Sequence, residues 1–193
     1  MANFINCLSI LEKDTALLYK KLSNRVDAPL LKSLLLSISE DSLKHSSLSK
    51  GVADSITKTP EKPSNCEKNT GEVWVLAANL NKEIDAKGTL SGEDMSQLSQ
   101  KLVFLESIMG EEYYIFVQMK TLEIITKEIN QIYSIDLGSL KSIFVNIIND
   151  EEHHREILEA IKNIIEQNKK SDNNPLVKYT NPDSWVSPFT ETQ

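Results

Sequence analysis

The chain has 193 residues, of which 40% are hydrophobic and 25% are charged, which suits one globular domain with a buried core. Its net charge of -7 and its few, isolated Lys/Arg pairs argue against nucleic acid as a partner. No apolar run approaches the roughly 20 residues of a membrane span and the N-terminus lacks the basic start of a signal peptide, so we expect a cytoplasmic protein with no membrane partner.

The first half of the chain carries the apolar spacing of two long helices. A first helix is expected over about residues 3–25. Asp27 followed by Pro29 is a cap-and-start signal for a second helix, which continues to about residue 57. The segment 59–69 contains two prolines and should end this helix.

A shorter helix and a third long helix follow. Thr70 is expected to cap a helix over residues 72–86. Ser91 with Asp94 three residues later is the sequence signature of a helix start, and the apolar spacing extends this third long helix to about residue 133.

The last long helix should begin after Asp136 and run over residues 137–170. Residues 171–193 contain three prolines and form a C-terminal tail, so the domain is expected to span residues 1–170. Alternating apolar runs are absent, which predicts no strands. The predicted fold is therefore all-α, with four long helices and a short helix inserted between the second and third.

Two cysteines, Cys7 and Cys66, occur far apart and outside any Cys-x-x-Cys motif. The sequence therefore predicts neither a rubredoxin-type iron site nor a zinc ribbon, and it does not indicate a disulfide framework.

The last helix places two ionisable residues within an apolar stripe. Positions with a 3-4-3-4-3-4 spacing hold Phe144, Ile147, Glu151, His154, Leu158, Ile161 and Ile165. Burying Glu151 and His154 would cost several kcal/mol unless both are satisfied inside, and a metal cation would satisfy both together. The alternative is that both lie solvated at the edge of the stripe, or that His154 is a core histidine bonded to the backbone.

Two further carboxylates lie on apolar helix faces. Glu12 lies among apolar residues of the first helix. In the third long helix the candidates are Glu112 and Glu111, and Glu112 is preferred because Met119, seven residues on, is apolar whereas Gln118 is not. The sequence thus predicts inward carboxylates at positions 12 and 112.

The second helix repeats the polar spacing of the last. Asp41 and His45 correspond to Asp150 and His154. The difference is that Ser42 stands where the last helix has Glu151.

On these residues the chain resembles the ferritin-like superfamily, and within it the rubrerythrin-like di-iron carboxylate proteins, without a rubredoxin module. The resemblance covers the four long helices and includes a Glu followed seven residues later by Tyr, Glu12 and Tyr19. It implies a ferritin-like four-helix bundle that holds two iron ions. The implied ligands are Glu12, His45, Glu112, Glu151 and His154, with Asp41 and Asp150 bonded to the ligand histidines.

The chain departs from the family at Ser42, because a hydroxyl is a poor iron ligand. Two divalent ions then face three carboxylates, unless Glu111, Asp41 or an exogenous anion fills the gap. Glu40 lies about 200° around the helix from Ser42 and is a poor substitute. His153 is expected at the surface.

The resemblance implies a peroxidase or ferroxidase, an oxidoreductase in which iron, or manganese, reacts with hydrogen peroxide or dioxygen. Electrons would come from a separate donor protein or from substrate iron, and a homodimer is expected. Tyr19, Tyr113 and Tyr114 are candidates for electron relay, although core tyrosines more often serve packing. The alternative function is a non-catalytic helical scaffold or binding protein with a degenerate metal site.

Overall fold

The computed structural model describes residues 2–56, 62–87, 90–126 and 137–172, with the side chains of 119–126, 137–140 and 168–172 left out of the description. This part of the chain consists of helices and the segments that join them and contains no strand, which confirms the all-α prediction. Its helices are α1 (Ala2–Ser23), α2 (Pro29–Ser55), α3 (Cys66–Thr70), α4 (Glu72–Ala86), α5 (Gly92–Thr126) and α6 (Leu137–Asp172).

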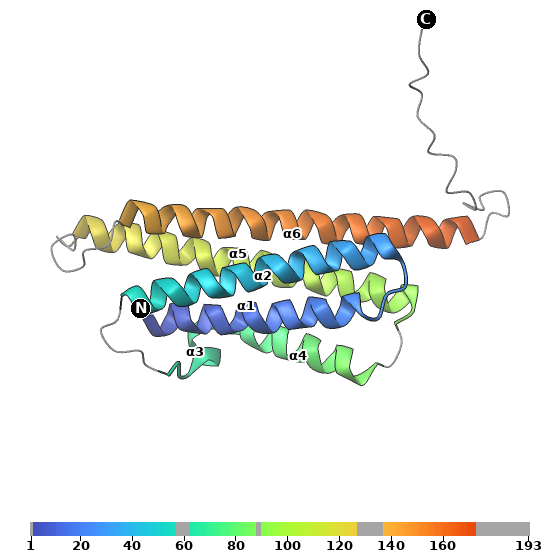
Figure 1. Cartoon of the computed structure of the whole chain (residues 1–193), viewed down its shortest axis with the longest axis horizontal. Helices are drawn as coiled ribbons and strands as arrows, with labels where there is room; N and C mark the ends of the chain where they lie inside the picture. The colour runs from blue at the N-terminus through green and yellow to red at the C-terminus, as the bar shows by residue number, and fades with distance from the viewer. Residues whose placement is uncertain (1, 57–61, 88–89, 127–136, 173–193) are drawn as a thin grey trace, which may run out of the picture.

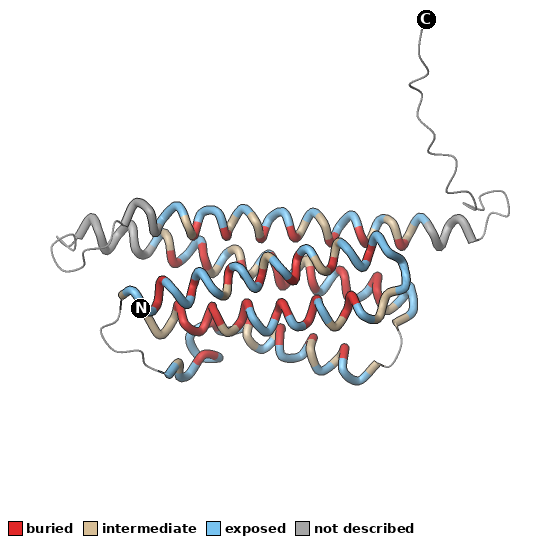
Figure 2. Tube along the Cα trace, in the orientation of Figure 1, coloured by how far each residue is buried: buried red, intermediate tan, exposed pale blue. Residues whose placement is uncertain are grey.

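The four long helices lie side by side, with α1 against α2 and α5 against α6, while α3 and α4 cover α1 on the side away from α6 (Figure 1). Along the long helices the buried residues lie mostly on the side that faces the other helices (Figure 2). The short helix α4 is held to α1 by ionic and backbone contacts as well as by apolar packing. Lys21 bonds to Asp85 at 2.9 Å, and the Arg25 guanidinium donates to the carbonyl groups of Ile84 and Lys87.

The apolar core is divided into two clusters. The larger includes Leu11 and Leu35 and reaches Leu158 on α6, and the smaller includes Leu8 and Phe144. Along α2 and α6 the chain passes from one cluster to the other through buried polar residues, whereas on α1 and α5 the buried Glu12 and Glu106 lie beside residues of the larger cluster. A buried polar layer therefore lies within the four long helices.

Two of the expected helix starts can be compared with the structure. Ser91 and Asp94 form the predicted capping box: the Asp94 amide donates to Ser91 Oγ at 3.1 Å and the Ser91 amide to Asp94 Oδ2 at 2.9 Å. Pro29 does occupy the first turn of α2, but the capping position is Ala28, without a side-chain cap bond. The assignment of Asp27 as the cap is therefore wrong.

The prediction that Thr70 caps the short helix is also wrong, because an additional helix, α3, precedes it. Thr70 ends α3, and its hydroxyl donates to the carbonyl oxygen of Cys66 at 3.0 Å. Gly71 then stands at the start of α4 with φ of +59°, a left-handed backbone conformation that glycine adopts without the clash of a Cβ. This residue turns the chain from α3 into α4.

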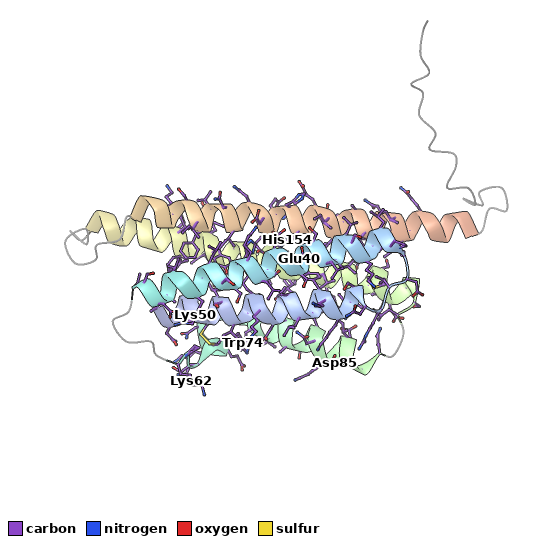
Figure 3. All side chains as sticks on the ribbon, viewed as in Figure 1. Glu40, Lys50, Lys62, Trp74, Asp85 and His154 are labelled. Carbon is purple, nitrogen blue, oxygen red and sulfur yellow. A yellow bond between two sulfur atoms is a disulfide. The ribbon has the colours of Figure 1, made fainter. Side chains whose placement is uncertain are left out.

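Cys7 and Cys66 form a disulfide, with 5.1 Å between their Cα atoms (Figure 3). The expectation that the sequence does not indicate a disulfide is therefore overturned. The bond joins α1 to α3, and Asn3 supports the same junction by exchanging two hydrogen bonds with the backbone of Ser64, at 2.9 and 3.0 Å.

Three expectations fall outside the described residues: the end of the third long helix near residue 133, the cap at Asp136, and the tail. Helix α6 continues to Asp172, close to its expected end. The division into a domain over 1–170 and a tail over 171–193 stays a prediction.

Candidate metal centre

Five ionisable side chains meet in the polar layer between the two apolar clusters. They are Glu12 from α1, His45 from α2, Glu106 from α5, and Glu151 and His154 from α6. Each is at most 2% exposed. Figure 3 labels His154, which lies where α6 faces α2. Such burial is costly for carboxylates unless a cation or hydrogen-bond donors compensate their charge.

The five side chains form two groups of three that share Glu151. Glu12, His45 and Glu151 form one group, and Glu106, His154 and Glu151 form the other; within each group the potential ligand atoms lie within 4.8 Å of one another. The two imidazole rings lie side by side, with 5.8 Å between their centres. Glu151 is therefore the one carboxylate placed to serve both groups.

The inner polar atoms are poorly satisfied within the described structure. Both oxygens of Glu12, both oxygens of Glu151 and Nδ1 of His45 lack a hydrogen-bond partner among the described residues. His45 Nδ1 lies 3.0 Å from Glu151 Oε1 and 3.6 Å from Glu12 Oε1, at ion-pair distance but without hydrogen-bond geometry. Buried polar atoms of this kind are rare in proteins and fit a site whose donors bind a metal ion.

The outer nitrogens of both histidines face aspartates of the opposite helix. His45 Nε2 lies 3.0 Å from Asp150 Oδ2, and His154 Nε2 lies 3.5 Å from Asp41 Oδ2. Lys44 joins the two aspartates, at 2.8 Å from Asp41 and 2.9 Å from Asp150. Asp150 thus favours a proton on His45 Nε2 and leaves His45 Nδ1 directed inward, as in metal sites whose ligand histidines are oriented by carboxylates. His154 Nε2 lacks a hydrogen-bond partner among the described residues, and His154 Nδ1 lies 3.1 Å from Glu106 Oε2.

Two buried tyrosines contact the carboxylates. The hydroxyl of Tyr19 donates to Glu106 Oε1, and burial together with Glu106 raises the pKa of Tyr19 well above its usual value. Tyr113 shares a hydrogen bond of 3.2 Å with Ser49, and burial and Glu12 raise its pKa likewise. Tyr114, which is 53% exposed, lies outside the core. Both buried phenols are therefore neutral donors at physiological pH.

The pKa values within the centre are strongly displaced. Burial opposes the charged form of His45, but Glu12 and Glu151 outweigh it and raise the pKa of His45 to about 11. The pKa of His154 rises to about 10 because Glu106 and Glu151 similarly outweigh burial. Burial, followed by repulsion from Glu12 and Glu106, raises the pKa of Glu151 to about 8. Without a metal ion, these shifts favour the protonated forms of both histidines and of Glu151 at neutral pH.

The inward carboxylate of α5 is Glu106, so the prediction that Glu112 occupies this place is wrong. Glu106 is 1% exposed, whereas Glu112 is half-buried and belongs to neither group. Glu111 is exposed, so this alternative to Glu112 also lies outside the centre. The missed signal was the spacing of Glu106 from two buried residues, four after Leu102 and seven before Tyr113.

The other predicted site residues, Glu12, His45, Glu151 and His154, lie together as expected. Gly110 allows α5 to approach Glu151 closely, because a Cβ at this position would lie 3.3 Å from Glu151 Cβ.

The residues expected to lie outside the centre do so. Glu40 and His153 are exposed. Ser42 is buried, and its hydroxyl donates to the carbonyl oxygen of Ile38 in its own helix at 3.0 Å. The hydroxyl is therefore already engaged within α2.

No protein-family model, no curated protein and no solved structure matches this chain. Within the described part of the chain, no helix combines the length and hydrophobicity needed to cross a membrane. The buried Glu/His groups could hold a metal ion.

Proposed function

We propose that the protein is a ferritin-like, non-haem metalloprotein that binds two metal ions, iron or manganese, and reacts with hydrogen peroxide or dioxygen. The observation that carries the proposal is the pair of buried three-residue groups sharing Glu151, with inner oxygens and a nitrogen that lack hydrogen-bond partners among the described residues. Mixed carboxylate and imidazole ligands suit iron and manganese.

When bound, a pair of ferrous ions would supply two electrons, one from each ion, for the two-electron reduction of peroxide or dioxygen. The side chains of this chain bind and orient. Asp150 holds the ring of His45, Glu106 holds the ring of His154, and Tyr19 fixes one oxygen of Glu106. The apolar clusters on both sides exclude bulk water. A separate electron donor, a homodimeric state and a cytoplasmic location are further parts of this proposal that follow from the family resemblance and the sequence.

Ser42 favours a second candidate function, a helical scaffold or binding protein whose metal site has degenerated. Its hydroxyl stands at the position that corresponds to Glu151 on the other half of the site, and it brings no charge. A scaffold of this kind would retain the packing of the helices but would neither bind metal tightly nor oxidise ferrous iron.

The metal content of the purified protein distinguishes the two functions. After expression in iron-replete medium, elemental analysis is expected to find bound iron or manganese. Because the ions bind the folded chain, saturation at about 1,000 times Kd should raise the free energy of unfolding by about 4 kcal/mol for each ion bound, and a chelator should remove this gain. The loaded protein should also oxidise ferrous iron when peroxide or dioxygen is added. A metal-free protein whose melting temperature ignores both Mn²⁺ and chelator would support the scaffold.

Metal binding should release protons and become tighter as the pH rises. In the metal-free protein the raised pKa values of His45 (about 11), His154 (about 10) and Glu151 (about 8) keep all three protonated at pH 7, and each must lose its proton to bind a cation. For every proton released, the apparent affinity for Mn²⁺ should rise about tenfold per pH unit, and the range from about pH 6 to 8 is suitable for the measurement. Calorimetry of Mn²⁺ binding in buffers of different ionisation enthalpy measures the number released. An affinity independent of pH would contradict the assigned ligands.

A further inference from the structure

The centre is built from two halves with equivalent residues. The half formed by α1 and α2 carries Glu12 and Tyr19, seven residues apart, and the half formed by α5 and α6 carries Glu106 and Tyr113 with the same spacing. Several contacts join one half to the other: Tyr19 with Glu106, His45 with Asp150, His154 with Asp41, and Thr15 with Met109. The polar layer thus has an approximate twofold relation.

One residue of the centre breaks this relation. Glu151 serves both groups from α6, but the equivalent residue of α2 is Ser42, which is 1% exposed and bonded to its own helix. Each group consequently has three protein ligands, and the side of the centre at Ser42 supplies none. Transition metals in proteins usually take four to six donors.

The side chain at position 42 is short by about one methylene and one carboxylate when it is compared with Glu151. Two divalent ions with three carboxylates and neutral histidines also retain one positive charge in a buried layer, where unbalanced charge is costly. Asp41 and Asp150 do not supply the missing donor, because they face the outer nitrogens of the histidines and bind Lys44.

We propose that a small monocarboxylate anion, formate or acetate in size, binds at the Ser42 side of the loaded centre, in the place that a glutamate at position 42 would fill. The anion supplies both the missing oxygen donors and the missing negative charge. This inference rests on the proposed metal binding and adds a ligand class to it. The equivalent group in the other half is the single carboxylate of Glu151, so a longer or doubly charged anion is not expected at this position.

The test measures Mn²⁺ binding to the full chain by equilibrium dialysis and elemental analysis, with sodium acetate or sodium chloride at equal ionic strength. Acetate should strengthen binding of the second ion to the wild type by at least about tenfold. Ser42→Glu should bind two ions in chloride and gain nothing from acetate. Ser42→Gln, which fills the same space without charge, should lose the acetate effect and bind the second ion weakly.

Ser47→Glu is the matched control. Ser47 is an exposed residue of α2 whose hydroxyl donates to the Leu43 carbonyl at 3.0 Å, the same type of bond that Ser42 makes. This variant adds a carboxylate to the same helix outside the centre, so it should keep the acetate dependence of the wild type.

The outcomes separate this inference from the proposed function. If the wild type binds two Mn²⁺ ions equally well in chloride and acetate, the anion position is refuted while metal binding stands. If the wild type binds no Mn²⁺ in either salt, the proposed function itself fails. If circular dichroism shows that Ser42→Glu does not fold, the effect of acetate on Mn²⁺ binding is compared in the wild type and Ser42→Gln alone, and an equal effect in both refutes the anion position.

Discussion

The Glu151→Gln variant is expected to lose both metal positions at once, with an affinity for Mn²⁺ more than about 100-fold below that of the wild type. Glu151 is the carboxylate common to the two groups, so its removal takes one donor from each. Glu106→Gln, in contrast, should weaken one position and leave the group of Glu12, His45 and Glu151 intact. Isothermal titration calorimetry measures the difference: Glu151→Gln should lose both binding events, and Glu106→Gln should lose one.

The stability of metal-free Glu151→Gln distinguishes a ligand from a structural residue. Because burial raises the pKa of Glu151 to about 8, the metal-free protein holds this side chain protonated at pH 7, and glutamine is its neutral isostere. The free energy of unfolding should therefore change by less than about 1 kcal/mol. Glu112→Gln, on the same helix as Glu106 but half-buried, is the control and should bind metal like the wild type. A Glu112 variant that loses metal would contradict the geometry of α5.

Reduction of the Cys7–Cys66 disulfide is expected to lower the free energy of unfolding by about 4 kcal/mol, the loop-closure entropy for a separation of 59 residues. For a chain of this size the melting temperature should fall by about 10 °C. Urea unfolding with and without dithiothreitol measures the effect. Metal content at 25 °C should be unchanged, since neither cysteine belongs to the two metal groups.

The double variant Cys7→Ser/Cys66→Ser provides the control for the reductant. It should unfold at the midpoint of the reduced wild type and should not respond to dithiothreitol. An oxidised wild type with the same midpoint as this variant would mean that the bond contributes nothing to stability.

The sequence was sufficient for the four long helices and α4, but not for α3, and for four of the five residues of the centre. The 3-4 apolar spacing of α6 predicted that Glu151 and His154 lie in the core. The same Asp-x-x-x-His spacing in α2 and α6 predicted that His45 is the counterpart of His154. The proposal of a ferritin-like bundle with iron depends on the resemblance, and the metal stays a prediction.

Helix α5 shows why periodicity alone failed for one residue of the centre, Glu106. Apolar residues surround much of this helix: Leu102 and Met109 face the core, while Phe104 and Ile115 are 55% and 42% exposed. A helix of this kind has no unique apolar stripe, so its inward face is decided by packing against α6 rather than by its own sequence. The spacing of Ile108 and Ile115 predicted that Glu112 faces the core, whereas the packing of the helices buries Glu106.

The disulfide could not be predicted for a different reason. Two cysteines without a motif carry no pairing signal, and their proximity depends on α3 docking against the first turns of α1.

The contacts that cross between the two halves bear on how the molecule opens. Glu106 receives its hydrogen bond from Tyr19 of the other half, and His45 and His154 face aspartates of the opposite helix. Separation of the two helical hairpins therefore exposes the whole polar layer at once, which makes the four long helices a single cooperative unit in amide hydrogen exchange. Helix α4 supplies no member of the centre, so its separation from the other helices would leave the contacts between the two halves in place.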